Sequence, residues 1–447
     1  MRSVLLCPEK STVTNLICLS GEQLFDWSAD YRLYSKDRVD ETVIFDSALN
    51  EVLAALPAEA PLVVALDDTL VRKCGTHIHG VAWRRDPLGP AFQTNLVRGQ
   101  RFLQMSAAWP LEGGEARMVP ILFHHAPSAP KLPRDADLKQ QEIHKETRRQ
   151  MNLNTYALEQ ITQLRKTVPS EREIILCGDG SYTNATIIKG IPEGSTYIGR
   201  TRKDAKLHAL PEIDPAKKTN GRPLCYGSVV STPEELRTDE SVAWEKVKAY
   251  AAGETHEFKI KTHEKVLWRK TGTKQVLRVV VIAPLGYRLR KGGKLLYRQP
   301  AYLICTDPEL PLEELLQHYL WRWGIEVNFR DEKTLIGAGD AHVRTAASNR
   351  HLPAVIVASY ALLWVAALKM HRQGSLPPGI TPPKWRCKSR EGKTLPSTGE
   401  LLRTLRYESW SKIIREPTLC DFTTDQNQET KCNKPSEALE SALSVAA

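Results

Sequence analysis

One stretch of the sequence carries four side chains whose types and spacing could do chemistry: Tyr319, Arg322, Glu326 and Lys333. Pro311 and the acidic residues after it predict that a helix begins shortly before this stretch. At 100° per residue the four positions fall within a sector of roughly 60° on one helix face, along about 21 Å of axis. A single carboxylate among cations and a phenol favours a metal ligand beside bound nucleic acid. The alternative is a solvated face with ion pairs between turns.

Two apolar runs that end in acids supply further candidates for the same site. The first begins at Pro61 and ends in Asp67 and Asp68, and the second ends in Asp179, between two glycines. A buried strand that ends abruptly in carboxylates is how α/β enzymes place acids at a sheet edge. Because successive strand residues point to opposite faces, only one of Asp67 and Asp68 should reach a shared metal ion.

The spacing Tyr-x2-Arg-x3-Glu-x6-Lys from Tyr319 to Lys333 resembles the signature of the bacterial insertion-sequence DDE transposases of the cut-and-paste group. The Arg-Trp-x-Ile-Glu run inside it strengthens the likeness, which extends from about residue 15 to about residue 370. The resemblance implies a catalytic and metal-binding trio of Asp68, Asp179 and Glu326. The family pattern, an acid directly before Thr, selects Asp68 over Asp67.

The resemblance also implies Mg²⁺ or Mn²⁺ as the cofactor, with two ions in each active site. Hard oxygen ligands suit either cation. Two such ions about 4 Å apart can activate a water or a 3′-hydroxyl and stabilise the leaving oxygen of a phosphodiester.

Several side chains are predicted to contact DNA. The resemblance implies that Tyr319, Arg322 and Lys333 hold phosphates near a cleaved transposon end, which agrees with the phosphate chemistry of these residue types. Arg200 and Arg202 lie just past the strand that follows the second acid. We expect them to make further phosphate contacts.

Aromatic residues form a second group of candidates. In relatives an aromatic of the insertion stacks on a flipped base, and Tyr302 is the predicted counterpart, with Trp268 as the alternative. A buried strand aromatic is the competing interpretation of both. Near the N-terminus, Trp27, Tyr31 and Tyr34 stand among charged residues. They could contact DNA or a partner subunit, or simply pack on the main core.

Composition agrees with a nucleic-acid partner. The 447 residues carry a net charge of +10, with a pI near 9.0, which favours an anionic partner. Nine cysteines without a Cys-x2-Cys pair indicate neither a disulfide framework nor a structural zinc site. The sequence predicts a protein of the bacterial cytoplasm, nucleoid-associated when bound to DNA. The apolar run 352–370 is interpreted as a buried helix rather than a membrane span.

The order of strands, helices and acids predicts an α/β fold with a ribonuclease H-like core, a mixed sheet flanked by helices. A β-rich insertion is expected to interrupt this core before the last catalytic helix. A single long helix is expected over about 138–166. The predicted divisions are a mostly helical N-terminal region (1–58), the first part of the core (59–202), the insertion (203–300), the second part of the core (301–373) and a C-terminal region with a disordered tail (374–447).

The predicted insertion is strongly basic. Residues 241–300 contain fourteen Lys and Arg against four Glu and no Asp. A strip that follows a phosphate backbone is the favoured interpretation, and a solvated basic surface is the alternative.

The leading hypothesis is a DNA transposase that acts as a homodimer on double-stranded DNA. It would bind the terminal inverted repeats of its element, cleave DNA by two-metal hydrolysis and join the 3′-hydroxyl ends to target DNA. One alternative is a ribonuclease H-like nuclease that cleaves without joining. Another is a domesticated DNA-binding protein without strand-transfer activity.

Overall fold

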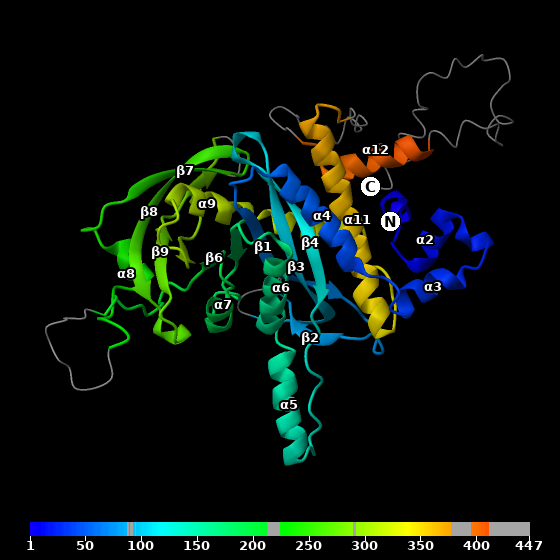
Figure 1. The fold of residues 1–447 in the computed structure, drawn as a ribbon, viewed down its shortest axis with the longest axis horizontal. Helices are drawn as coiled ribbons and strands as arrows, with labels where there is room; N and C mark the ends of the chain where they lie inside the picture. Colours follow the sequence, from blue (N-terminus) through cyan, green and yellow to red (C-terminus); the bar gives the residue numbers. More distant parts are fainter. Residues whose placement is uncertain are drawn as a thin grey trace.

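A large mixed β-sheet forms the centre of the computed structural model, which describes residues 1–86, 89, 93, 95–211, 224–288, 292–376 and 395–410 (Figure 1). In the described part of the chain this sheet has ten strands in the order β2-β3-β1-β5-β6-β12-β9-β8-β7, with β4 paired to β3. A small hairpin of β10 and β11 stands apart. The strands are β1 (Leu62–Arg72), β2 (Ala82–Arg85), β3 (Leu96–Pro110), β4 (Ala116–His125), β5 (Ile174–Gly178), β6 (Ser195–Arg200), β7 (Glu245–Ala251), β8 (Glu254–Leu267), β9 (Val276–Ile282), β10 (Gly286–Arg288), β11 (Leu295–Tyr297) and β12 (Ala301–Cys305).

The first five long strands confirm the predicted ribonuclease H-like core. Strands β1, β3 and β4 are antiparallel neighbours, and β5 and β6 then continue parallel to β1. The start of β1 is apolar at every position from Leu62 to Leu66 because both of its faces are covered by helices.

The β-rich insertion extends this same sheet. Strand β9 pairs with β12, and β8 and β7 follow outward to the edge, so that the insertion forms one wing of the molecule (Figure 1). The sequence patterns missed β7, because Lys246 and Lys248 alternate with buried Val247 and Ala249 and make the segment look like a polar surface. The sequence patterns predict two separate strands at 255–260 and 266–270, but the structure has one strand, β8, with an irregularity in its pairing after His263.

Helices cover both faces of the sheet. On one face α4 and α6 pack against the even-numbered residues of β1, such as Leu66, and on the other α9 and α10 pack against Val63 and Ala65. The helices are α1 (Arg2–Leu6), α2 (Val13–Ser20), α3 (Ser28–Ser35), α4 (Glu41–Ala55), α5 (Leu138–Gln150), α6 (Leu153–Thr167), α7 (Ala185–Gly190), α8 (Pro233–Thr238), α9 (Leu312–Trp321), α10 (Gly324–Thr334), α11 (Ala346–Arg372) and α12 (Thr398–Trp410).

The single helix predicted over 138–166 is wrong, since two helices occupy this range. Helix α5 ends at Gln150, and the side chain of Asn152 accepts a hydrogen bond from the backbone of Asn154 and so begins α6. None of the thirteen residues of α5 is buried, and the helix projects away from the body (Figure 1). The sequence signal for the second helix was Asn152, a residue type that often caps a helix, but the apolar periodicity continued across it.

The helix predicted to carry Tyr319 to Lys333 on one face is also interrupted. The backbone amides of Arg322 and Trp323 bond to carbonyls three residues back instead of four, which separates α9 from α10. Gly324 begins α10 where a Cβ would lie 2.5 Å from the Met118 side chain, so a glycine is required for this close approach to β4. The ideal 100° spacing therefore does not describe the arrangement of the four side chains.

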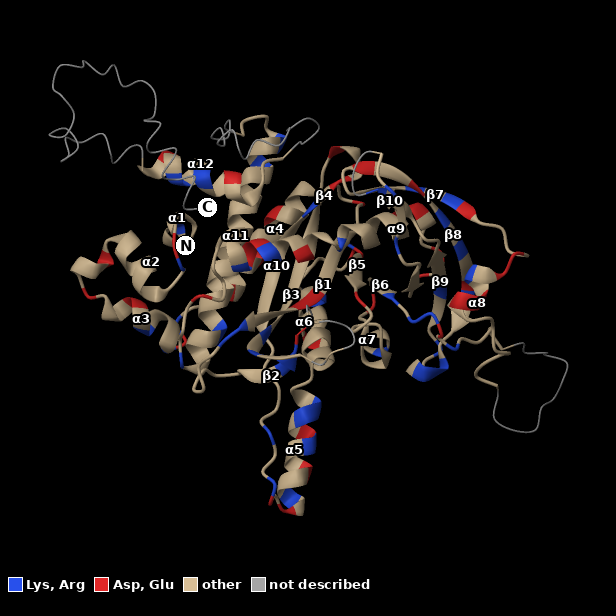
Figure 2. Cartoon of the chain, turned by 180° about the vertical axis from the view of Figure 1, so that it is seen from behind, with Lys and Arg blue, Asp and Glu red and all other residues tan. Residues whose placement is uncertain are grey.

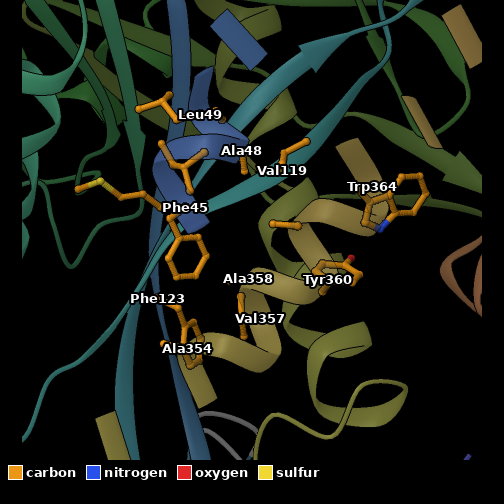
Figure 3. Close-up of a cluster of buried hydrophobic side chains, with 14 of the residues drawn as sticks. Phe45, Ala48, Leu49, Val119, Phe123, Ala354, Val357, Ala358, Tyr360 and Trp364 are labelled. Atoms are coloured by element: carbon orange, nitrogen blue, oxygen red, sulfur yellow. The ribbon is translucent and has the colours of Figure 1, made fainter. Parts of the chain in front are cut away.

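Helix α11 is the largest apolar element and packs along β4 and α4 (Figure 3). Phe45 and Phe123 meet the α11 residues Ala354 and Val357, and Trp364 lies further along α11. By length and composition α11 could cross a membrane, but 83% of its apolar window is buried inside the fold. This burial agrees with the interpretation of 352–370 as a core helix.

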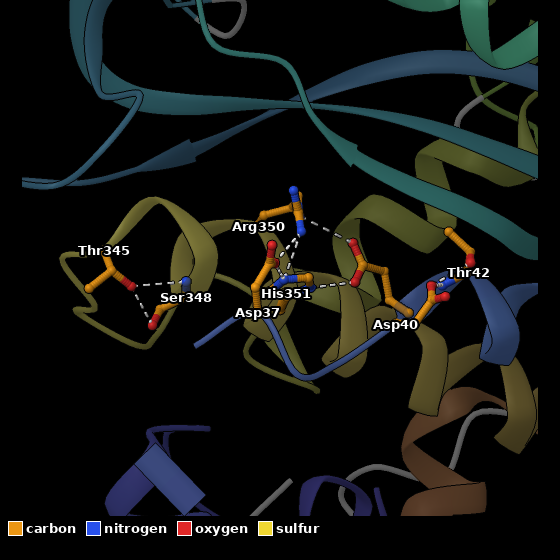
Figure 4. A network of polar contacts seen from close by, with 8 residues as sticks. Asp37, Asp40, Thr42, Thr345, Ser348, Arg350 and His351 are labelled. Atoms are coloured by element: carbon orange, nitrogen blue, oxygen red, sulfur yellow. Dashed lines mark hydrogen bonds and ion pairs between the residues drawn. The ribbon is translucent and has the colours of Figure 1, made fainter. Parts of the chain in front are cut away.

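The N-terminal helices are fastened to α11 by a cluster that we call the His351 clamp, made of Asp37, Glu41, Arg350 and His351 (Figure 4). His351 is only 2% exposed, and its two ring nitrogens lie 2.5 Å from Glu41 Oε2 and 2.5 Å from Asp37 Oδ1. The hydrogen bond from His351 is the main cause that lowers the pKa of Asp37. These contacts join the start of α4 to the start of α11.

The remaining N- and C-terminal predictions have mixed outcomes. Tyr34 packs on the main core, whereas Trp27 and Tyr31 are exposed and meet edge to face, with ring centroids 5.8 Å apart. At the other end, α12 packs on α1 through Arg406, which donates to the carbonyls of Leu5 and Cys7. The predicted disordered tail lies outside the described residues, and the predicted domain boundaries stay predictions.

Candidate active site

The three acid-bearing elements meet at one edge of the sheet. Strands β1 and β5 run parallel with Leu66 opposite Gly178, so Asp67 and Asp179 come next on neighbouring strands. A cavity of about 810 Å³ opens there. Its charged lining consists of Asp67, Asp68, Asp86, Asp179, Glu326, Asp340, Arg72, Arg84, Arg85, Arg101 and Lys333.

Asp67 points to the sheet face that α10 covers. It follows Val63 and Ala65 in alternation, and both of these pack with residues of α10. Its carboxylate accepts a hydrogen bond from Arg322 over 3.2 Å, and both side chains are largely buried. Burial, reinforced by the negative charge of Asp179, raises the pKa of Asp67 to about 8, and Glu326 acts in the same direction.

Asp68 points to the opposite face. Its carboxylate lies 3.1 Å from Arg101 Nε and accepts a hydrogen bond from the Tyr182 hydroxyl over 3.0 Å. Burial raises the pKa of Asp68 while Arg101 opposes that rise. The sequence signature selected Asp68, yet the structure brings Asp67, and not Asp68, to the side of Glu326.

Asp179 and Glu326 complete the acidic part of the cavity. Asp179 follows β5, where its carboxylate accepts a hydrogen bond from the Ser181 amide over 2.8 Å. A Cβ at Gly178 would lie 2.6 Å from the Tyr197 hydroxyl, which explains a glycine immediately before this acid. Glu326 stands in the first turn of α10, and its charge reaches both Asp67 and Arg322.

The predicted phosphate-binding residues of the signature lie around these acids. The Arg322 guanidinium stands 5.6 Å from the ring centroid of Tyr319, and Tyr319 is partly buried beside it. Lys333 is exposed at the cavity, with its Nζ 5.8 Å from the centre of the Phe329 ring. Arg322 and Lys333 therefore border the acids from two sides.

Arg200 and Arg202 have different surroundings. Arg200 is exposed at the end of β6, and its charge influences the pKa of Tyr319, which places it near the signature residues. Arg202 is 80% exposed and forms a two-pronged pair with Asp204, with both nitrogen–oxygen distances 2.9 Å. Arg200 is thus the nearer of the two to the acidic cavity.

The placement of Tyr302 corrects its predicted role in base stacking. Its ring is 6% exposed within a hydrophobic cluster on β12, and its hydroxyl donates to Glu234. Trp268 also packs, partly buried, against this cluster. The competing interpretation, a buried strand aromatic, describes Tyr302, because β12 is covered on both faces and no residue from Tyr302 to Cys305 is exposed.

Part of the positive charge of the insertion has an internal use. Lys261 is buried, donates to the Asp239 carbonyl over 2.5 Å and lies 4.5 Å from the Trp244 ring. Arg278 is buried and donates to the Leu310 carbonyl over 2.7 Å. Other basic residues of β7 and β8 remain on the outer surface (Figure 2). The composition of 241–300 therefore overstates the charge that DNA could meet.

Sequence reasoning missed a buried acid on α10. Glu332 is 1% exposed and accepts a hydrogen bond from Gln104 Nε2 over 2.9 Å, at the β3 position that pairs with Asp67. Burial raises its pKa to about 8. The only signal in the sequence was an acid directly before Lys333, which reads equally well as a surface ion pair.

The donor set fits a divalent cation, although the side chains are not arranged as a finished cage. In the described ranges no three His, Cys, Asp or Glu side chains stand close enough together to hold a metal ion. Burial is the main cause that raises the pKa of Asp67, and the negative charges of Asp179 and Glu326 add to it. Hard carboxylate oxygens in such a cluster suit Mg²⁺ or Mn²⁺, whose charge would relieve the repulsion.

Residues 1–275 match the family described as DDE superfamily endonuclease. The match covers more than half of the chain and includes β1 and β5 with their acids. The chain belongs to the DDE superfamily of endonucleases. Membership in this family means DNA cleavage of the nuclease or transposase type, with DNA as the substrate, and the family generally uses divalent metal ions. A search of curated proteins found no match for the chain.

Glu326 and the signature from Tyr319 to Lys333 lie beyond the matched residues of this DDE endonuclease. They enter the candidate site through the fold, since α10 packs on β1 and β4 and brings Glu326 to the acids of β1 and β5. Residues inside the family match and residues beyond it therefore line the same cavity.

Proposed function

We propose that this DDE endonuclease is a transposase that binds the ends of a mobile element, cleaves them and joins the freed 3′-hydroxyl ends to target DNA. The observation that carries the proposal is the gathering of Asp67, Asp179 and Glu326 at one cavity, beside Arg322 and Lys333. Acids that bind metal ions, next to basic side chains that bind phosphates, are the combination that phosphodiester chemistry requires.

Asp67, Asp179 and Glu326 would hold the divalent ions, which we propose to be two Mg²⁺ or Mn²⁺. When bound, they would activate the attacking water or 3′-hydroxyl and stabilise the leaving oxygen. We choose Asp67 over Asp68 because it shares the sheet face of Glu326. The choice differs from the one that the family signature favours. Asp68 then holds Arg101 in position.

The neighbouring residues would place the DNA strand. Arg322, fixed by Asp67, and exposed Lys333 would offer their remaining donors to phosphate oxygens, and exposed Arg200, near Tyr319, would add a further contact. Because Tyr302 is buried, we assign the stacking role to Trp323, whose ring is 66% exposed on the turn between α9 and α10. We further propose a homodimer in the DNA complex, within the bacterial cytoplasm.

Nicking of a supercoiled plasmid tests the cleavage step. We expect the purified chain to nick plasmid DNA in Mg²⁺ or Mn²⁺ and to lose this activity on chelation or in Asp179→Asn. Asp307→Asn, an acid on a loop of the same sheet, serves as the matched control. Equal nicking by Asp179→Asn and the wild type would overturn the assignment of the site.

Strand transfer needs a separate assay, because a nuclease would pass the first one. Short duplexes with the inverted repeats from the DNA beside the gene, precut to expose 3′-hydroxyls, are incubated with a target plasmid. A transposase yields covalent duplex–plasmid products that Glu326→Gln does not form. Cleavage without such products would identify a nuclease, and binding without cleavage would identify a DNA-binding protein.

A further inference from the structure

Arg84 is a buried cation without a full set of partners. It lies on β2, is 8% exposed and lines the cavity that holds the acids. Among the described residues, nothing accepts a hydrogen bond from its Nε or Nη2. Leaving a buried guanidinium with unused donors costs free energy, so such a group requires an explanation.

Among the described residues, Arg278 is also buried but lacks a hydrogen-bond partner only at Nε, whereas Arg84 lacks one at two nitrogens. Arg165, which is partly buried, shows the contacts of a structural arginine. Arg165 donates to the carbonyls of Val168, Pro169, Arg172 and Gly194. These donors tie the end of α6 to the loops around β5, as a structural arginine should. Arg84 makes no comparable set of contacts with the described residues, so a purely structural role does not account for it.

A second arginine stands close to Arg84. Strand pairing places Arg84 opposite Val97 of β3. Arg101 lies four residues after Val97 on the same strand, so its side chain points to the same face of the sheet. The positive charge of Arg101 helps to lower the pKa of Arg84 to about 10, although burial is the larger cause. Asp68 is the acid that lies near both, and its carboxylate is in contact with Arg101. Two guanidinium groups beside one carboxylate leave positive charge for an anion.

We propose that Arg84 and Arg101 form a phosphate-binding subsite, which takes a backbone phosphate of the DNA near the bond that is cut. Guanidinium groups bind phosphate oxygens through paired hydrogen bonds, and the unused donors of Arg84 line the same cavity as the acids. The substrate class rests on the proposed function, whereas the affinity for phosphate follows from the two arginines alone.

The subsite divides the cavity into two parts of opposite charge. Asp67 and Glu326 lie on the sheet side that α10 covers, whereas the side chains of Arg84 and Arg101 lie on the opposite sheet face with Asp68. Cations would bind in the first part and a phosphate in the second. Asp68 lies at the boundary and orients Arg101 as a positioning residue.

Thermal unfolding in inorganic phosphate tests the subsite without DNA or metal. We expect phosphate to raise the Tm of the wild type, because a ligand that binds only the folded state stabilises it. Arg84→Met should remove this response and should itself leave Tm unchanged or raise it, since it removes an unsatisfied buried charge. Lys166→Met, an exposed cation at the far end of α6, should respond as the wild type does.

A phosphate response in Arg84→Met equal to that of the wild type would overturn the proposal. If the Tm of this variant is lowered as well, the role of Arg84 is structural. If Arg84→Met fails to fold, Arg101→Met is measured in its place, and an undiminished phosphate response there contradicts the subsite.

DNA binding in EDTA gives an independent test that is separate from cleavage. The affinity for a fluorescent duplex is measured over a range of salt concentrations, and the logarithmic slope should fall by about one for each lost phosphate contact. We expect this reduction in Arg84→Met and Arg101→Met but not in Lys166→Met. A wild type that binds but never cuts would refute the proposed function alone. Unchanged slopes in both arginine variants would refute the subsite alone.

Discussion

The acidic cavity and the His351 clamp are both clusters of buried charge, but they are satisfied to different degrees. In the clamp, His351 is in contact with Asp37 and Glu41 through both ring nitrogens. In the cavity, burial and the neighbouring acids raise the pKa of Asp67, and Arg84 keeps unused donors within the described structure. We infer that the paired charges of the clamp hold the fold together, whereas the unused donors of Arg84 in the cavity mark a place where another molecule binds.

The largest effect is expected from removal of a cavity acid. Glu326→Gln should reduce metal-dependent nicking by about a thousandfold, since metal ions supply several kcal/mol of transition-state stabilisation. DNA binding in EDTA should remain, because the amide preserves the shape of the side chain. Glu314→Gln, an exposed acid on α9, is the matched control. Nicking by Glu326→Gln at the control rate would show that this cavity is not the catalytic centre.

The two neighbouring aspartates of β1 sharpen the comparison within the cavity. Asp67→Asn should lose Mn²⁺ binding and nicking together, because Asp67 lies on the sheet face that α10, which carries Glu326, covers. Asp68→Asn should keep Mn²⁺ binding and weaken DNA affinity through Arg101, with which its carboxylate is paired. The reverse pattern, with Mn²⁺ binding lost only in Asp68→Asn, would support the residue that the sequence signature favours.

A substitution in the His351 clamp should lower the stability of the fold and leave metal binding unchanged. His351→Phe leaves the mostly buried Glu41 with only Arg350, whose Nε lies 3.9 Å away, and breaking a buried pair costs about 3 kcal/mol of unfolding free energy. Chemical denaturation measures this loss, and Mn²⁺ affinity of the folded variant should not change. Unaltered stability with reduced Mn²⁺ affinity would contradict the division between the two regions.

The smallest effect concerns the pH dependence of stability. The pKa of Glu332 is raised from 4.5 to about 8 by burial, so the folded chain binds this proton more tightly than the unfolded chain does. Its contribution to stability is complete below about pH 4.5 and is lost as the pH rises through about 8. Glu332→Gln cannot ionise, so Tm should decline less between pH 5 and pH 8. An identical decline in variant and wild type would contradict the assigned pKa.

The sequence predicted the parts of this fold that local pattern determines. The apolar run ahead of Asp67 and the glycines around Asp179 indicated two strands that end in acids, and the structure places them side by side. The signature around Glu326 was also recognisable, because four spaced residue types are specific. These features can be predicted because each depends on residues that are close together in the sequence.

The remaining features depend on contacts between distant segments. The helix is interrupted before Gly324 because this residue lies close to Met118. The helical periodicity of the sequence gives no sign of this contact. Tyr302 looked available for stacking until the packing of β12 and the contact with Glu234 placed it inside. Arg84 reads as one of many surface arginines in the sequence, and only burial without partners distinguishes it.

A titration of Mn²⁺ followed by electron paramagnetic resonance tests the central claim most directly, since it needs neither the DNA ends nor turnover. The account predicts saturable Mn²⁺ binding by the wild type that is lost in Asp179→Asn and kept in Asp307→Asn. Equal binding by the wild type and Asp179→Asn would contradict the claim that the acids of β1, β5 and α10 form one metal-binding cluster.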